Sequence, residues 1–112
     1  RQAEVVHSII TEGCTIEGHV ENSVLSNSVT VGAGARVLYS ILHPGVVVEP
    51  GAVVEYAILG EGTVVGAGAH VGAQPDGTDA WCVATVGPDV AVPAGATVPA
   101  GAMIYDGAEV HA

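Results

Sequence analysis

The chain has 112 residues, which is room for one domain, and its formal net charge is −10 because twelve carboxylates face only two basic residues, Arg1 and Arg36. Nucleic-acid binding depends on clustered Lys and Arg, so this charge excludes nucleic acid as an expected partner. No apolar run approaches the roughly 18 residues of a membrane span and no signal peptide is present, so we expect a cytoplasmic domain without membrane contact.

The first predicted turn is shorter than those that follow it. Ile9-Ile10 aligns with Val24-Leu25 at an interval of 15, whereas Val20 aligns with Val37 at an interval of 17. We therefore expect the chain to begin with a turn that lacks two residues.

A seventeen-residue period organises the middle of the chain. Each period divides into steps of six, five and six residues between large aliphatic residues, as from Val31 to Val37, Leu42 and Val48. Such steps predict a solenoid with three sides, each side one short parallel strand. We expect the glycines of the repeat to occupy its corners, where φ is positive, and alternate residues of each strand to face inward. The shared columns are Val31/Val48/Val65, Gly34/Gly51/Gly68, Ala35/Ala52/Ala69 and Val37/Val54/Val71.

Residues 14–71 and 86–104 resemble the hexapeptide-repeat proteins. The pattern is most regular in three consecutive units, Val86-Gly-Pro-Asp-Val-Ala, Val92-Pro-Ala-Gly-Ala-Thr and Val98-Pro-Ala-Gly-Ala-Met. The resemblance implies an all-β fold, a three-sided left-handed parallel β-helix with about 17 residues per turn. We expect residues 1–112 to form one such domain. Because the sequence begins at Arg1 and its only methionine is Met103, we also expect it to be a C-terminal fragment of a longer chain.

A second break in the repeat lies at residues 72–82, and residues 105–112 follow the last turn. Residues 72–82, with Pro75-Asp-Gly-Thr-Asp-Ala-Trp81, are expected to project from a corner as a loop whose Trp81 covers an open edge or contacts a partner. Residues 105–112 are too short for another turn and are expected to cap one end of the solenoid.

The histidines and cysteines do not predict a metal or catalytic site. His19 and His70 share one column but lie three turns apart, so roughly 14 Å separates them and they cannot bind one metal ion. Cys14 belongs to a column that continues as Val29 and Val46, which makes it a small core residue rather than a disulfide or zinc ligand. We therefore expect no catalytic, cofactor or metal site in this segment.

Several outward positions carry apolar residues without an evident structural need. We expect them to contact a neighbouring domain or subunit, since a contiguous exposed apolar group marks a contact face. A β-favouring surface without a partner is the alternative. The interface candidates are Leu38, Tyr39, Val47, Val53, Tyr56, Val64 and Trp81.

A closer resemblance rests on Glu12-Gly-Cys-Thr-Ile-Glu-Gly-His-Val-Glu-Asn-Ser-Val-Leu25, on residues 29–37, and on Ser40-Ile-Leu42 and Tyr56-Ala-Ile-Leu59. These stretches look like the carboxyl-terminal domain of glucose-1-phosphate adenylyltransferase, in particular the bacterial glycogen-biosynthesis regulatory subunit. The resemblance implies a non-catalytic domain that packs against an N-terminal nucleotidyltransferase domain of the same chain and against sister subunits. It also implies a site for an anionic metabolite effector, for which Arg36 is the one candidate within the repeats.

A hexapeptide-repeat acyltransferase that is active as a trimer is the second hypothesis. Such enzymes share the repeat and often carry a catalytic histidine near a looped-out segment, whereas residues 72–82 contain no histidine. A γ-type carbonic anhydrase, with histidine ligands across a trimer interface, is a third and weaker one. Residues upstream of Arg1 and acetyl-CoA binding would discriminate between the first two.

Overall fold

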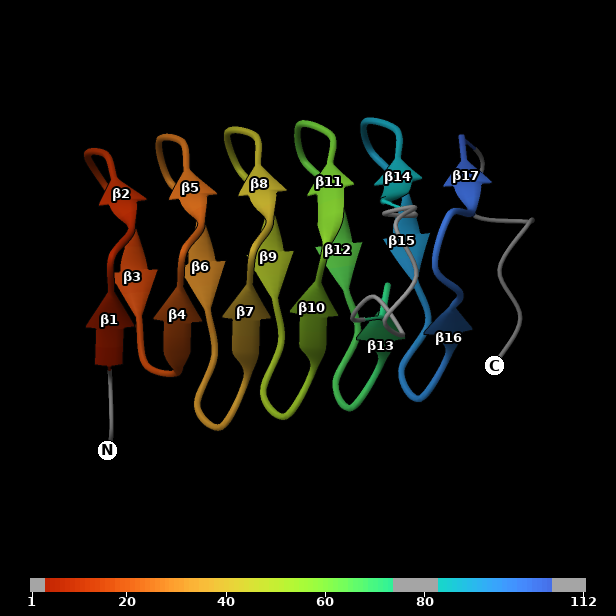
Figure 1. Ribbon diagram of the computed structural model, residues 1–112, viewed down its shortest axis with the longest axis horizontal. Coiled ribbons are helices and arrows are strands. Elements are labelled where there is room, and N and C mark those ends of the chain that lie inside the picture. Colours follow the sequence, from red (N-terminus) through yellow and green to blue (C-terminus); the bar gives the residue numbers. More distant parts are fainter. Residues whose placement is uncertain (1–3, 74–82, 106–112) are drawn as a thin grey trace.

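The computed structural model describes residues 4–73 and 83–105, and every regular element in those ranges is a short β-strand (Figure 1). The strands are β1 Glu4–Val6, β2 Ile9–Ile10, β3 Thr15–Ile16, β4 His19–Glu21, β5 Val24–Leu25, β6 Thr30–Val31, β7 Arg36–Leu38, β8 Ile41–Leu42, β9 Val47–Val48, β10 Val53–Glu55, β11 Ala57–Leu59, β12 Val64–Val65, β13 His70–Val71, β14 Ala84–Val86, β15 Ala91–Val92, β16 Thr97–Val98 and β17 Met103–Ile104. None of the described residues forms a helix that could span a membrane.

The strands form three parallel sheets, which confirms the predicted three-sided solenoid. Sheet A has the order β1-β4-β7-β10-β13-β16, sheet B the order β17-β14-β11-β8-β5-β2, and sheet C the order β15-β12-β9-β6-β3. Each strand therefore pairs with the third strand after it in the chain, and one circuit of three strands makes one rung of the stack (Figure 1).

The strand register confirms the seventeen-residue period and both of its expected breaks. Ile10 pairs with Leu25 at an interval of 15, whereas Val20 pairs with Val37 at 17. Of the three sides of the first rung, only the segment from β3 to β4 is shorter than its counterpart in the second rung. The two missing residues therefore belong to the corner between β3 and β4. The later break lies between β13 and β14, where the pairing interval rises from 17 for Val54 and Val71 to 27 for Ala57 and Ala84.

Some predicted features cannot be placed on the fold. Residues 74–82 of the expected loop, with its Trp81, and residues 106–112 of the expected cap lie outside the described residues.

The interior is a narrow column of branched aliphatic side chains. Leu25, Leu42 and Leu59 occupy equivalent positions on successive rungs of sheet B, and each is completely buried. Valines fill the equivalent positions of sheets A and C, so the core is a stack of near-identical layers. Gly34 and Gly51 lie at corners with φ of +74° and +77°, as the repeat predicts.

A ladder of serines stabilises the corner between sheets A and B. The Ser40 hydroxyl donates to the Leu38 carbonyl at 2.9 Å and accepts from the backbone N–H of Ala57 at 3.2 Å. The Ser23 hydroxyl makes the same pair of bonds with Glu21 and Ser40. These bonds satisfy buried backbone groups at a corner where non-glycine residues such as Tyr39 and Tyr56 adopt φ of +51°.

Candidate functional site

The outward row of sheet A is polar and charged. Its members in register are Glu4, His19, Arg36, Val53, His70 and Thr97. His19 is held on both sides, since its Nδ1 lies 3.0 Å from Glu4 Oε1 and its Nε2 lies 3.0 Å from Glu21 Oε1. The hydrogen bond with Glu21, together with Glu4, raises the pKa of His19 against the opposing effect of burial. The protonated ring can donate to both carboxylates, whereas a neutral ring has only one N–H.

The shortened first rung leaves a hollow of about 320 Å³ beside this row. It is lined by Glu17, Gly18, His19, Ala33, Gly34, Ala35 and Arg36. Gly18 is required there because an added Cβ would lie 2.3 Å from the Ala35 carbonyl oxygen. The hollow therefore exists where the longer corner of the second rung projects past the shorter corner of the first.

Arg36, the predicted effector candidate, lies at this hollow and is exposed. Within residues 4–73 and 83–105 it forms no ion pair, because the ion pairs found there all involve His19 or His70. His19 lies beside it in register but has both ring nitrogens engaged by carboxylates. Arg36 is thus the one side chain in the hollow that offers free N–H donors to an anion.

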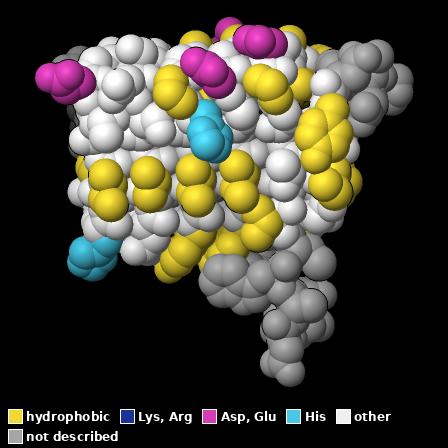
Figure 2. Space-filling model, turned by 90° about the horizontal axis from the view of Figure 1, so that it is seen from above, with side chains coloured by type: hydrophobic (Ala, Val, Ile, Leu, Met, Phe, Trp, Pro, Cys, Tyr) yellow, Lys and Arg dark blue, Asp and Glu magenta, His cyan; other side chains and the backbone are white. Residues whose placement is uncertain are grey.

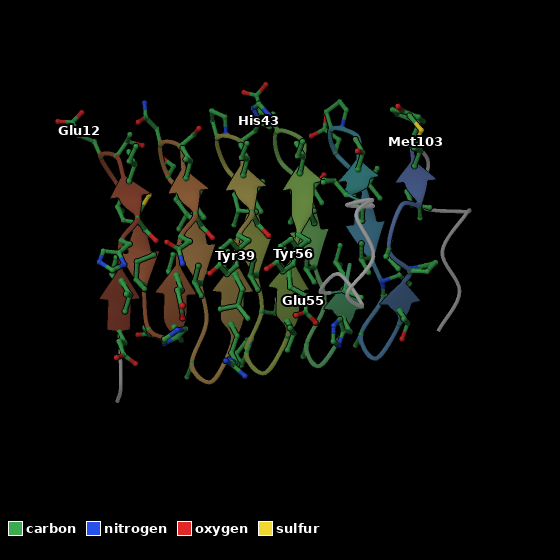
Figure 3. The ribbon with its side chains drawn as sticks, viewed as in Figure 1. Glu12, Tyr39, His43, Glu55, Tyr56 and Met103 are labelled. Atoms are coloured by element: carbon green, nitrogen blue, oxygen red, sulfur yellow. The ribbon has the colours of Figure 1, made fainter. Side chains whose placement is uncertain are left out.

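Tyr39 and Tyr56 stack at the corner between sheets A and B (Figure 3). Their ring centroids are 4.9 Å apart and the ring planes differ by 8°. Tyr39 is 42% exposed, and Tyr56 is half-buried. Burial raises the pKa of the Tyr56 hydroxyl, helped by Tyr39, Glu55 and Glu21. Glu55 lies beside this pair and accepts a hydrogen bond from His70.

The structure corrects one interface candidate. Leu38 was expected to be exposed but is only 5% exposed. It lies in register between Glu21 and Glu55, so residues of the rungs before and after it flank its outward position.

Five of the remaining candidates lie on three separate surfaces, and the sixth, Trp81, is outside the described residues. Val47 and Val64 are neighbours in register on the outward row of sheet C, and both are half-buried. Val53 lies on sheet A between Arg36 and His70. The tyrosines form the third surface, so the structure does not bring these residues into one patch.

The outward row of sheet B was missed by the sequence reasoning. It consists in register of Ile9, Val24, Ile41, Ile58, Thr85 and Met103. Figure 2 shows the row of hydrophobic side chains along the length of the solenoid. The signal was present, because strands such as Ile41-Leu42 carry two consecutive apolar residues and only one of them can face inward.

Residues 1–92 match the family model described as GlmU-like, C-terminal hexapeptide. The chain belongs to this family. The match covers most of the solenoid and confirms the resemblance to hexapeptide-repeat proteins.

Curated relatives confirm the second resemblance. The chain is 49% identical over 47 residues to glucose-1-phosphate adenylyltransferase of Clostridioides difficile (strain 630), which is 42% of this chain and 12% of that protein. It is 51% identical over 43 residues to the Bacillus cytotoxicus protein of the same name, which is 38% of this chain and 11% of that protein. The matched stretch is therefore a small part of each relative.

A solved structure extends the comparison to nearly the whole chain. The acetyltransferase domain of PglB from Neisseria gonorrhoeae FA1090 superposes with a TM-score of 0.73 and 29% sequence identity. The alignment covers 94% of this chain and 49% of that one. This hexapeptide-family chain thus resembles adenylyltransferases over a stretch of its sequence and an acetyltransferase domain over 94% of its length.

Proposed function

We propose that this chain is the structural and regulatory oligomerisation domain of an ADP-glucose-forming nucleotidyltransferase, acting in the cytoplasm in glycogen- or starch-type glucan synthesis. The observation that carries the proposal is the 49% identity over 47 residues to a glucose-1-phosphate adenylyltransferase. In this assignment the solenoid itself is non-catalytic, and the reaction belongs to an N-terminal nucleotidyltransferase domain.

The exposed corner and sheet surfaces supply the contacts in this proposal. The stacked tyrosines present a flat and rigid apolar group with hydroxyls at its rim, a composition that is favourable at interfaces. Val47 and Val64 add a second apolar surface on sheet C, and Val53 a third on sheet A. We assign these surfaces to the N-terminal domain and to sister subunits.

The regulatory part of the proposal concerns the hollow beside Arg36. Its guanidinium would bind a carboxylate or phosphate of a metabolite by paired hydrogen bonds. Glu4, Glu17 and Glu21 lie close by and oppose an anion electrostatically, so Arg36 alone gives weak binding. A complete effector site therefore requires further basic groups from the neighbouring domain.

A chimera tests the proposal. The 47-residue stretch of the Clostridioides difficile enzyme would be replaced by the matching stretch of this chain, and both assembly and ADP-glucose formation would be measured. We expect a chimera that assembles and catalyses like its parent. A matched control carries a hexapeptide stretch of the same length from the acetyltransferase domain of PglB. If this chain supports assembly no better than that control, the assignment fails.

An acetyltransferase is the second candidate, and the superposition on the acetyltransferase domain of PglB favours it. Calorimetric titration with acetyl-CoA separates the two candidates. Saturable binding with a micromolar Kd, competed by CoA, would support the acetyltransferase. Absence of binding at millimolar acetyl-CoA would exclude it.

A further inference from the structure

Sheet B presents the one outward sheet face of the described rungs that is largely apolar and without charge. None of the residues in β2, β5, β8, β11, β14 and β17 is charged, although the chain carries a net charge of −10. Sheet A, in contrast, exposes carboxylates, imidazoles and a guanidinium in its outward row. Sheet C is also uncharged, but threonines and alanine make up much of its outward row.

The apolar residues of sheet B are exposed and adjacent. Ile9 is 62% exposed, Val24 37%, Ile41 42% and Met103 61%. Ile9, Val24, Ile41 and Ile58 are direct neighbours in register, so rungs about 4.8 Å apart form one unbroken apolar row. A contiguous exposed row of this kind marks a contact surface rather than scattered surface residues.

We propose that this face binds the same face of a second copy of the chain, sheet against sheet. The proposal rests on the proposed oligomerisation function and deepens it, because it names the face and the partner. Two copies that each carry ten net negative charges repel one another, so the favourable contact is one that brings no carboxylates together. Regularly spaced rows of Ile and Val on both copies can then interdigitate.

The acidic edge of the face decides how the two copies are oriented. Exposed Glu12, Glu61 and Asp89 follow sheet B strands at the corner with sheet C, where exposed His43 also lies (Figure 3), and Figure 2 shows acidic side chains beyond one long edge of the apolar row. A two-fold axis across the strand stack would place the two acidic edges against each other. A two-fold axis along the solenoid places each acidic edge over the opposite edge of the other copy, with the rods parallel.

The parallel arrangement brings complementary groups together on the first two rungs. The edge of sheet B opposite the carboxylates consists of His7, Asn22, Tyr39 and Tyr56. On the first rung, His7 of one copy would lie over Glu12 of the other, and on the second rung Asn22 would lie over Asn27. Because His7 and Glu12 are both exposed, they are free to form this pair.

The size of the face predicts a weak and reversible dimer. Six strands extend over about 24 Å and each side of a rung over about 17 Å, which gives about 400 Å² per copy before the edges are added. The total of about 800 Å² lies below the range of stable specific contacts, where association is weak and transient.

Sedimentation velocity over a wide range of protein concentration tests the proposal. We expect the wild-type chain to form dimers reversibly, and Val24→Lys or Ile41→Lys to weaken association at least about tenfold by placing charge in an apolar contact. Thr97→Lys, at an exposed outward position of sheet A, is the matched control and should associate like the wild type. Circular dichroism and thermal melting establish that each variant is folded.

The outcomes separate this inference from the proposed function. A wild-type chain that remains monomeric, or dimers that survive Ile41→Lys but not Val64→Lys, would overturn the sheet B contact. In both cases the chimera experiment still tests the oligomerisation domain independently.

A charge exchange tests the orientation. Glu12→Lys and His7→Asp should each weaken the dimer. The double variant should restore it, because the introduced carboxylate of one copy would then face the introduced ammonium group of the other. Failure of the double variant to recover would overturn the parallel arrangement.

Discussion

His19 shows how a single side chain can link two rungs. It connects β1 with β4 through Glu4 while it also contacts Glu21 on its own strand. Both contacts are favourable together only when the ring carries two protons, and Arg36 in the next rung is the neighbouring fixed charge. The first strand is therefore held to the second rung by a group whose pKa is raised in the folded state.

We expect the stability of the first rung to depend on pH through His19. The pKa of His19 is higher in the folded state than in the unfolded state. The stabilisation by protonated His19 is therefore complete below the unfolded-state pKa of about 6.5, and it is lost as the pH rises through the folded-state pKa. This contribution is therefore larger in mildly acidic solution than in alkaline solution. Hydrogen exchange of β1 amides should show less protection at pH 8 than at pH 6.

His19→Gln is the control for this effect. Glutamine retains a donor but does not titrate, so β1 protection in this variant should change less between the two pH values. An unchanged pH dependence in the variant would assign the effect to another group.

Ser40 gives a second prediction at the scale of one residue. Ser40→Ala removes a hydroxyl that serves one buried N–H and one buried carbonyl, so we expect a loss of about 1–3 kcal/mol in the free energy of unfolding. Urea denaturation measures it. Thr30→Ala, on the outward row of sheet C, should lower the free energy of unfolding much less. Equal losses in the two variants would show that the serine ladder makes no special contribution to stability.

At the scale of the elements, the lengths of the corners determine the strand pairing of the solenoid more than the strands themselves do. Most strands contain only two or three residues, and their pairing is set by how many residues each corner contains. The corner at Gly18 is a tight constraint because it lacks two residues and packs against the carbonyls of Gly32 and Ala35. A change there should disturb two rungs.

Gly18→Ala should therefore be far more destabilising than Gly68→Ala. The first places Cβ against backbone oxygen and should cost about 2–3 kcal/mol. The second meets no atom within 4 Å, and its cost of about 1 kcal/mol arises only from φ of +71°. Chemical denaturation measures the free energy of unfolding of both variants. Equal losses of stability would show that backbone strain, rather than close packing against the added Cβ, determines the cost of the substitution.

The sequence predicted the rungs well because their cause is local and repeated. Aliphatic spacing located the strands, and the shorter interval at the start of the repeat located the short first rung. Two features required the structure. Leu38 is buried although it lies on the outward row, flanked by residues of the rungs before and after it, and alternation along its own strand does not reveal this. The hollow beside Arg36 arises from a mismatch between two corners, a difference that no single repeat contains.

At the scale of the whole molecule, chemistry is divided among the three faces. Sheet A carries the titratable groups, sheet B exposes apolar side chains, and sheet C is uncharged and mixed. A rod with different faces can contact several neighbours at once without competition among them. This division supports the proposed role in assembly.

Val47→Lys together with Val64→Lys tests the sheet C surface. Both side chains point outward and are half-buried, so lysine stems should be accommodated and the fold should persist. We expect loss of assembly in the chimera, measured by sedimentation. Thr97→Lys on sheet A is the control, and an unchanged oligomer in the double variant would exclude sheet C from the interface.

The long connection from β13 to β14 shows how the solenoid can accept added residues. The pairing interval there is 27 instead of the 17 of the preceding rung, yet β14, β15 and β16 all continue the sheets in register. Added length at a corner is therefore absorbed without propagating along the stack. Foreign segments grafted at the equivalent corner after β10 should be tolerated in the same way, so the solenoid can be varied by insertion while its rungs remain constant.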